Sequence, residues 1–334
     1  MARVVASTSL NTVNPNAWYG QTTHASSTQV VVSDGYNTGV YGGFGFTYDW
    51  SGRLVGGTLT SYSEYYNNRL EGRVDQFSVH AGVANNLISA NNLPGLFAIV
   101  QNGADTVFGS SQNDRLAGYN GNDYIYGGGG NDFIDGGAGH DVITVGYGNS
   151  FIAGGSGLDT VNLTGTGGSY RFGSTIEGRQ FWNADNTVNV NLESVERISF
   201  QDGTLAFDLD GNAGKAYRLY QAAFDRTPDR DGLSYWVDEL DAGKGDLAWM
   251  ANNFLISNEF RSTYGTPATV SDASFLTLIY NNVLDRGPDQ TGFNYWMDEL
   301  GRGFSRERVL ASFSESSENQ ANVADAIHDG IWLL

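Results

Sequence analysis

One large aliphatic residue recurs every nine positions between Val100 and Asn162. The recurring positions are Val107, Leu116, Ile125, Ile134, Ile143, Ile152 and Val161. Each lies in the middle of a three-residue run that suits a short strand, with its side chain on the inner face. The pattern therefore predicts an array of short strands, each of which contributes one core residue.

The residues before each strand form a loop with a regular chemistry. An Asp stands two places before almost every aliphatic position: Asp105, Asp114, Asp123, Asp132, Asp141 and Asp159, with Ser150 in the remaining unit. Glycines at the fourth place of a unit include Gly103, Gly121, Gly130, Gly139 and Gly157. Glycine allows positive φ, so the loop can turn its carbonyls inward, and a carboxylate supplies the hard oxygen that Ca²⁺ prefers. These residues are the predicted metal-binding residues.

The units resemble the calcium-binding nonapeptide repeat of RTX proteins, G-G-x-G-x-D-x-U-x. The resemblance implies a right-handed parallel β-roll in which two units make one turn. Loops eighteen residues apart would then stack on one edge, with strands about 4.8 Å apart, and successive carboxylates would hold an ion between them. A low-complexity linker or a metal-free β-solenoid is the alternative, but neither explains the regular carboxylate.

This stacking predicts two unequal edges. The first edge carries Asp105, Asp123, Asp141 and Asp159. The second edge carries Asp114 and Asp132, and then the neutral Ser150; Gln112 also replaces a loop glycine there. We expect about four or more Ca²⁺ ions, one of them weakly held. His140 is expected to be a solvent-facing loop residue rather than a metal ligand.

Residues 1–99 are expected to form a β-rich cap at the start of the array. Four aromatic residues alternate with small or polar ones: Phe44, Phe46, Tyr48 and Trp50. A turn at 51–52 leads from them into residues 54–62, which predicts a β-hairpin. The aromatic stripe is interpreted as the buried face of a sheet, with a platform for sugar rings as the alternative. Residues 87–100 are predicted to form a short helix that covers the open end of the array.

Residues 163–212 are expected to close the other end of the array with further strands. Their inward-facing positions are predicted to be Ile198, Phe200, Leu205 and Phe207. The run from Asp208 to Asn212 is similar to the start of an EF-hand loop. Ala213 stands where that loop needs glycine, and no Glu follows at the twelfth position. An EF-hand is therefore not expected.

Residues 213–334 change to the spacing of helices, and a second repeat appears with a period of sixty residues. Residues 219–240 and 279–300 share the pattern Asp-Arg-x-Pro-Asp-x-x-Gly-x-x-Tyr-Trp. This pattern resembles the DUF4214 family, which is appended to bacterial secreted and surface proteins and has no established function. The resemblance implies an all-helical domain with two copies of one unit.

The shared residues of this repeat suit an architectural role. The prolines are expected to end one helix, and Asp229 and Asp289 to cap the next. Asp225 and Arg226, like their counterparts Asp285 and Arg286, are interpreted as an internal ion pair. A carbohydrate or partner site built from Arg, Asp and Trp is the alternative, and two copies would then bind with avidity.

The chain of 334 residues has 18 Lys and Arg, 37 Asp and Glu, a net charge of −19 and no cysteine. This acidity argues against nucleic acid and anionic membranes as partners. No apolar run suggests a transmembrane segment, and Met1 to Asn14 holds no Sec-type signal. RTX proteins leave the cell through a type I exporter that reads an uncleaved C-terminal signal, and residues 326–334 are compatible with one. Calcium outside the cell would then fold the array.

No sequence motif of a metalloprotease, a serine hydrolase, a P-loop enzyme or a cysteine nucleophile is present. A glycosidase with a carboxylate pair such as Glu64 and Glu71 is the less favoured enzymatic alternative. We therefore expect a secreted calcium-binding RTX protein, not an enzyme, with a structural or adhesive role at the cell surface, through surface polysaccharide or self-association. An extracellular polysaccharide-binding module is the second hypothesis.

Overall fold

The computed structural model describes residues 1–7, 20–174, 178–266 and 268–334. Residues 8–14, which belong to the N-terminal segment in which no Sec-type signal is expected, lie outside the described residues. The contacts between residues divide the chain into two compact units, Met1–Asp202 and Gly203–Leu334. The first unit is built mainly from strands and the second mainly from helices, as the hydrophobic patterns predict.

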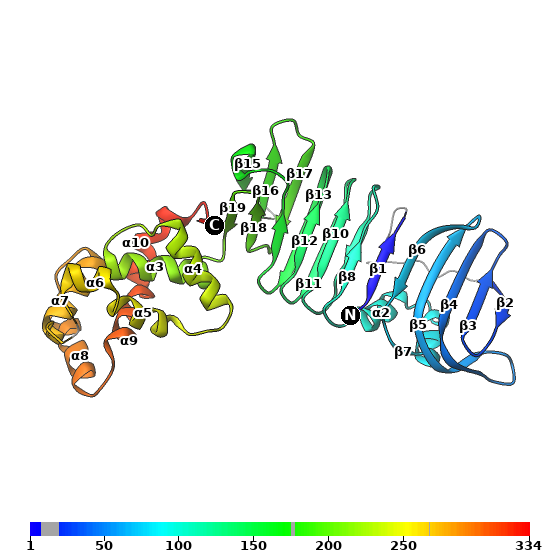
Figure 1. Cartoon of the computed structure of the whole chain (residues 1–334), viewed down its shortest axis with the longest axis horizontal. Coiled ribbons are helices and arrows are strands. Elements are labelled where there is room, and N and C mark those ends of the chain that lie inside the picture. Colours follow the sequence, from blue (N-terminus) through cyan, green and yellow to red (C-terminus); the bar gives the residue numbers. More distant parts are fainter. Residues whose placement is uncertain (8–19, 175–177, 267) are drawn as a thin grey trace. The chain divides into compact units, whose positions relative to one another are not determined.

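The N-terminal part of the first unit is a sheet of mostly antiparallel strands (Figure 1). Its strands are β1 (Arg3–Ala6), β2 (Gln21–Ala25), β3 (Gln29–Ser33), β4 (Asn37–Tyr48), β5 (Leu54–Tyr66), β6 (Arg69–Asp75) and β7 (Val79–His80). The order is β2-β3-β4-β5-β6-β1, and β7 pairs with β5. β1 pairs antiparallel with β6 and parallel with β8 (Thr106–Phe108), so it links this sheet to the array.

The predicted hairpin is confirmed, because β4 and β5 pair antiparallel around the turn at 51–52. The prediction that the aromatic stripe is buried is wrong in part. Phe46 is 5% exposed, but Phe44 is 59% and Trp50 98% exposed. The register of β4 shifts between Phe44 and Thr47, and Gly45 adopts a φ of +66°. This bulge breaks the alternation of faces, and Trp50 lies beyond the end of β4.

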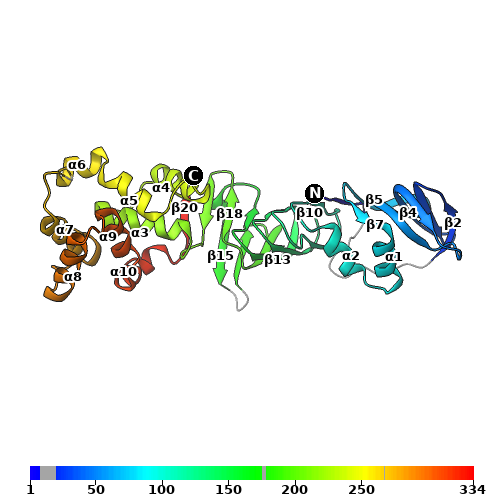
Figure 2. The same ribbon diagram turned by 90° about the horizontal axis from the view of Figure 1, so that it is seen from below.

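Two helices precede the array instead of the single helix predicted over 87–100. They are α1 (Ala81–Ser89) and α2 (Leu93–Val100). Asn91 adopts a φ of +55° between them, and the side chain of Asn92 caps α2 by accepting a hydrogen bond from the Gly95 N–H over 3.0 Å. α1 packs against β5 (Figure 2).

The array forms the predicted short strands, which alternate between two sheets. They are β8, β9 (Arg115–Ala117), β10 (Tyr124–Gly128), β11 (Phe133–Ala138), β12 (Val142–Val145), β13 (Gly148–Ser156) and β14 (Thr160–Asn162). β8, β10, β12 and β14 are parallel neighbours in one sheet, and β9, β11 and β13 in the other. The aliphatic residues predicted to face inward are all 0% exposed, so a column of apolar side chains fills the space between the sheets.

After the array, the chain adds a short 3₁₀ helix (Gly167–Ser169) and four strands: β15 (Tyr170–Ser174), β16 (Arg179–Asn183), β17 (Val188–Glu193) and β18 (Arg197–Phe200). β15 and β16 form a hairpin. β17 continues the sheet of β13, and β18 continues the sheet of β14, both in parallel. The predicted inward positions Ile198 and Phe200 are buried.

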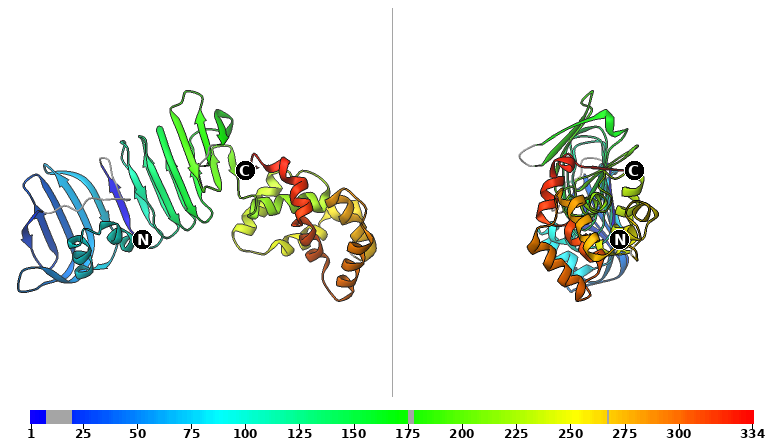
Figure 3. Two further views of the ribbon diagram at one scale, coloured as in Figure 1. Left: turned by 180° about the vertical axis from the view of Figure 1, so that it is seen from behind. Right: turned by 90° about the vertical axis from the view of Figure 1, so that its left-hand side faces the viewer.

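The second unit contains β19 (Gly203–Ala206), eight helices among its described residues, and β20 (Ile331–Leu333). The helices are α3 (Asn212–Phe224), α4 (Arg230–Asp241), α5 (Leu247–Leu255), α6 (Asn258–Tyr264), α7 (Asp272–Leu284), α8 (Gln290–Gly301), α9 (Arg306–Ser314) and α10 (Ser317–Ile327). α3 to α6 and α7 to α10 follow the same order of helix lengths up to the last member, which is the structural form of the sixty-residue repeat. These helices are coloured from yellow-green to red in Figure 3.

The segment 213–334 is not all helical, because β20 near the C-terminus pairs antiparallel with β19. The tail predicted to carry an export signal therefore includes an ordered strand. Asp208 accepts a hydrogen bond from the Ala213 N–H over 3.0 Å at the start of α3, so it belongs to a helix start, as the mismatches to an EF-hand suggest. None of the helices in the described chain is long and apolar enough to cross a membrane.

The helix caps of the repeat are confirmed. Each arginine forms an internal ion pair, as the sequence suggests, but its partner is not the preceding aspartate. Asp229 and Asp289 each accept a hydrogen bond from a glycine N–H in the first turn of α4 and α8, over 2.8 Å. Asp225 ends α3 with a φ of +52°. Arg226 instead pairs with Glu259 over 2.7 Å, a residue of α6. The same pairing recurs between Arg286 and Glu318 in the second copy.

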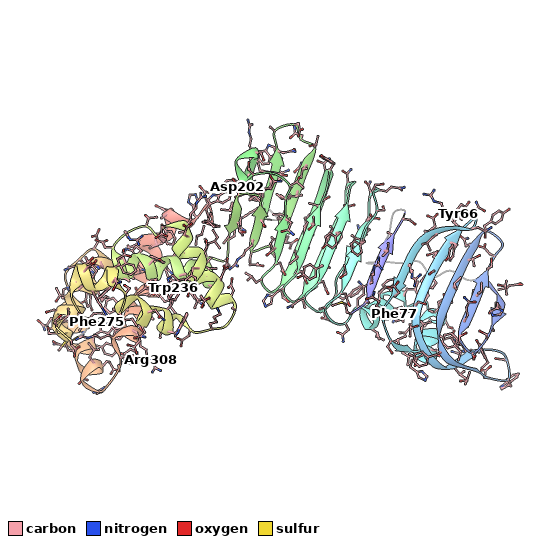
Figure 4. All side chains as sticks on the ribbon, in the orientation of Figure 1. Tyr66, Phe77, Asp202, Trp236, Phe275 and Arg308 are labelled. Atoms are coloured by element: carbon pink, nitrogen blue, oxygen red, sulfur yellow. The ribbon has the colours of Figure 1, made fainter. Side chains whose placement is uncertain are left out.

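The tryptophans of the repeat, Trp236 and Trp296, pack against the helical core. Trp236 packs edge-on against Trp249 and Phe254, at ring distances of 5.5 and 5.3 Å. Figure 4 shows Trp236 and the buried Phe275 among the helices. The preceding Tyr235 is 54% exposed and packs edge-on against Trp236, so only the tryptophan anchors the packing of α4.

Candidate functional site

The structure brings the aspartates of each edge together in the loops that precede the strands. On the first edge, the Asp105 N–H donates to Asp123 Oδ1 over 2.7 Å, and Asp123 and Asp141 each donate to the next aspartate over 2.9 Å. On the second edge, the Asp114 N–H donates to Asp132 Oδ1 over 2.9 Å. Loops eighteen residues apart therefore stack in register, and one carboxylate oxygen of each pair is bound by the backbone.

The second carboxylate oxygen is the unusual feature of these loops. All six aspartates are at most 3% exposed. Five of them have a buried Oδ2 atom without any hydrogen-bond partner: Asp105, Asp123, Asp132, Asp141 and Asp159. Removing an ionised oxygen from water without a partner is costly. The loops therefore need a bound cation or a proton at each of these oxygens.

The first glycine of a unit makes room beside this oxygen. A Cβ atom at Gly118 would lie closer than 3.0 Å to Asp123 Oδ2 and to the carbonyl oxygen of Gly136. Gly136 has the same relation to Asp141 Oδ2 and to the carbonyl of Gly154. A carboxylate oxygen and a backbone carbonyl from the next loop thus face one small space that only glycine leaves open.

The fourth-place glycines turn the loops. Their φ values are +156° for Gly103, +129° for Gly121, +110° for Gly130, +129° for Gly139 and +140° for Gly157. Side-chain-bearing residues rarely adopt such angles. The stacking adds a second constraint, since a Cβ at Gly139 would overlap the carbonyl of Gly121 in the preceding loop. Backbone angle and close approach together explain the recurrence of glycine.

The two edges are unequal in the structure. Asp114 Oδ2 accepts hydrogen bonds from the N–H and hydroxyl of Ser110, over 2.6 and 3.0 Å, so this oxygen already has protein partners. Farther along the second edge, the Asp132 N–H donates to the hydroxyl of Ser150 over 3.2 Å where a carboxylate would otherwise stand. The second edge therefore offers fewer free anionic oxygens than the first.

Burial raises the pKa of these carboxyls. It raises the pKa of Asp123 and of Asp159 to about 7, and neighbouring carboxylates add to the effect. It raises the pKa of Asp132 to about 6, and those of Asp105 and Asp141 move in the same direction. Without a cation, burial therefore shifts the protonation equilibrium of these carboxyls towards the acid.

The loops suit a metal that binds backbone carbonyls as well as side chains, as Ca²⁺ does. No three His, Cys, Asp or Glu side chains in the described ranges gather closely enough to hold a metal by themselves. Ca²⁺ accepts backbone carbonyls together with carboxylates, and that is the oxygen set beside Gly118 and Gly136. His140 is otherwise engaged, because its Nδ1 accepts a hydrogen bond from the Leu158 N–H over 2.8 Å.

Glu196, a carboxylate next to the array, is not among the metal-binding residues that the sequence predicts. The Asp159 N–H donates to Glu196 Oε2 over 2.9 Å. Glu196 lies thirty-seven residues after Asp159, so the nonapeptide spacing gives no sign of it. Only the pairing of β14 with β18 brings the two residues together.

The glutamates considered for a glycosidase also lie near each other. Glu64 of β5 pairs with Gly72 of β6, next to Glu71. Burial, and then the charge of Glu71, raises the pKa of Glu64. Tyr41 and Tyr62 pack at a ring distance of 4.8 Å close to Glu64. This arrangement gives the enzymatic alternative a concrete location.

Calcium affinity should fall as the pH is lowered through about 7, because the ion must then displace protons from Asp123 and Asp159. The stability of the metal-free fold should change in the opposite direction, and should fall as the pH rises. A folded-state pKa above the unfolded value contributes stability at low pH that is lost as the pH rises through about 7. Calorimetric titration with Ca²⁺ at about pH 8 and about pH 5.5, in buffers of different ionisation enthalpy, measures both affinity and proton release. An affinity that is independent of pH would contradict this prediction.

Comparison with known proteins adds two family matches. Residues 101–134 and 135–165 match the RTX calcium-binding nonapeptide repeat, and residues 251–323 match the domain of unknown function DUF4214. The second match covers most of α5 to α10, so the first copy of the sixty-residue repeat, at 219–240, lies outside it. No curated protein matches the chain.

Among solved structures, the chain is similar to the extracellular lipase LipA from Serratia marcescens, with 20% identity and a TM-score of 0.16. The similarity covers 29% of this chain and only 14% of the lipase. Such a short and distant likeness indicates neither the fold nor the activity of the whole chain. The family matches confirm both resemblances seen in the sequence: the chain carries RTX calcium-binding nonapeptide repeats and a DUF4214 domain.

Proposed function

We propose that this is a secreted calcium-binding protein whose RTX array forms a right-handed parallel β-roll when it binds Ca²⁺ outside the cell. The observation that carries the proposal is the set of buried aspartate oxygens without a partner, each in a glycine-lined loop. The parallel pairing of strands eighteen residues apart supports the roll. Asp105, Asp114, Asp123, Asp132, Asp141 and Asp159 are the proposed carboxylate ligands, and the loop glycines supply carbonyls.

Calcium also offers a reason for the timing of folding. At low calcium, the stacked carboxylates repel one another, and glycine favours the disordered chain. The array then stays unfolded while a type I exporter moves it. Outside the cell, binding to loops that exist only in the folded state contributes directly to folding free energy.

Circular dichroism tests this coupling. In chelator the β signal should be weak, and addition of millimolar Ca²⁺ should increase it cooperatively. Mg²⁺ at the same concentration is the matched control, because it demands a tighter octahedral shell and keeps its water. A full β signal in chelator that calcium leaves unchanged would rule out the folding mechanism.

The edges should respond differently to the same substitution. Asp141→Asn removes a charge from the middle of the first edge, between Asp123 and Asp159, and should weaken calcium binding by at least about tenfold. Asp114→Asn, the matched control, changes a carboxylate whose Oδ2 is already bound by Ser110, so its effect should be smaller. Calcium titrations of both variants measure the difference. Equal losses would contradict the proposed asymmetry.

The biological role that we propose is structural or adhesive, at the cell surface or in the extracellular matrix, through self-association or surface polysaccharide. The acidic chain and the absence of recognised catalytic motifs support this role over a secreted hydrolase. Glu64 and Glu71, on the neighbouring strands β5 and β6, are the carboxylate pair on which the hydrolase alternative rests.

A polysaccharide-binding module is the second candidate, and one observation favours it. Trp50 is 98% exposed at the turn of the hairpin, whereas Trp236 and Trp296 pack against the helical core. If sugar binds there, purified surface polysaccharide should change tryptophan fluorescence, and Trp50→Ala should abolish the change. Trp236→Phe serves as the control. A response that survives Trp50→Ala would place the sugar elsewhere, and no response at all would favour self-association.

A further inference from the structure

The first edge does not stop at Asp159, the last aspartate of the array. β14 pairs in parallel with β18, and the register that matches Thr160 with Arg197 places Glu196 opposite Asp159. The Asp159 N–H donates to Glu196 Oε2 over 2.9 Å. Asp141 makes the same contact, at the same distance, to Asp159 Oδ1. Glu196 thus takes the position of the next aspartate on the edge.

The connection between β17 and β18 also supplies a backbone oxygen. A Cβ atom at Gly154 would lie closer than 3.0 Å both to Asp159 Oδ2 and to the carbonyl oxygen of Ser194. Within the array, Gly118 and Gly136 face the same two kinds of atom. The short connection 194–196 therefore reproduces the oxygen arrangement of a full nonapeptide loop, although its sequence has neither the glycines nor the length of one.

The Asp159 carboxylate shows that this arrangement is incomplete without a further partner. Its side chain is 0% exposed, and its Oδ2 atom has no hydrogen-bond partner. An unpaired, buried anionic oxygen that faces a carbonyl is stabilised by a cation. Glu196 adds a second negative charge next to Asp159.

A protein cation also lies near this position, and it defines the competing explanation. Arg179 of β16 is close enough to Glu196 for the two charges to interact. In the competing explanation, Glu196 only pairs with Arg179 and accepts the Asp159 N–H. That role would leave Asp159 Oδ2 unsatisfied, whereas a metal ion would bind it.

We propose that Asp159, Glu196 and the Ser194 carbonyl form an additional calcium site that joins the array to the segment closing it. The inference rests on the proposed calcium binding of the array. The site extends the first edge by one ion beyond the nonapeptide repeats. It attaches β17 and β18 through the same metal that folds the array.

Counting bound ions tests the site. Equilibrium dialysis with ⁴⁵Ca²⁺ should give one ion fewer per chain for Glu196→Gln, which keeps an oxygen that can accept the Asp159 N–H but removes the charge. Glu193→Gln is the matched control, since Glu193 is exposed three residues earlier and should leave the count unchanged. An unchanged count in Glu196→Gln overturns the inference while leaving calcium binding by the array intact. A wild-type chain that binds no calcium refutes the proposed function itself.

A second measurement keeps the inference testable if Glu196→Gln does not fold. A crystal structure of the wild-type chain, grown in millimolar calcium, should show anomalous density next to Asp159 Oδ2, Glu196 and the Ser194 carbonyl. Density at the array loops but not at this position would overturn the inference. Density at none of them would refute the proposed function.

Discussion

The structure depends on one electrostatic constraint: six carboxylates are buried in stacked loops, and five of them leave one oxygen without a hydrogen-bond partner. Asp123, Asp141 and Asp159 each offer one oxygen to the backbone and leave the other facing a backbone carbonyl. Like charges in such a stack repel, and burial raises their pKa values, so the stack is stable only with cations or with protons. If that cation is Ca²⁺, as we propose, folding of the array and binding of the ion are two aspects of one equilibrium.

The apolar column and the charged edges depend on the same register. A shift of one residue between neighbouring strands would move residues such as Ile143 out of the core. It would also separate the carboxylate of Asp141 from the N–H of Asp123. Glycine is required at the turns for two reasons, positive φ and the close approach of carbonyls. Where a loop departs from the pattern, as at Ser110 and Ser150, a serine hydroxyl forms a hydrogen bond with Asp114 or with the N–H of Asp132.

A repetitive stack of strands has two open ends, and different segments of the chain close them. β1 pairs with β8 at one end, where the Ala2 N–H donates to Asp105 Oδ1, as the N–H of a preceding array loop would. β17 and β18 cover the other end.

The helical unit is stabilised differently. It contains two copies of a helix–cap–helix motif, and each copy has an Arg–Glu ion pair. Exposed ion pairs of this kind contribute about 0–1 kcal/mol each, so its stability comes mainly from its apolar core.

The sequence by itself determined the strand positions, the inward aliphatic residues, the two kinds of edge and the helix caps at Asp229 and Asp289. These features repeat locally, and short-range periodicity records them. Tertiary structure decided the rest. The bulge at Gly45 exposes Phe44, Arg226 pairs with Glu259 rather than with Asp225, and Glu196 reaches Asp159 across thirty-seven residues. Each of these contacts depends on which strands or helices become neighbours, and pairing between distant segments leaves no periodic signal in a single sequence.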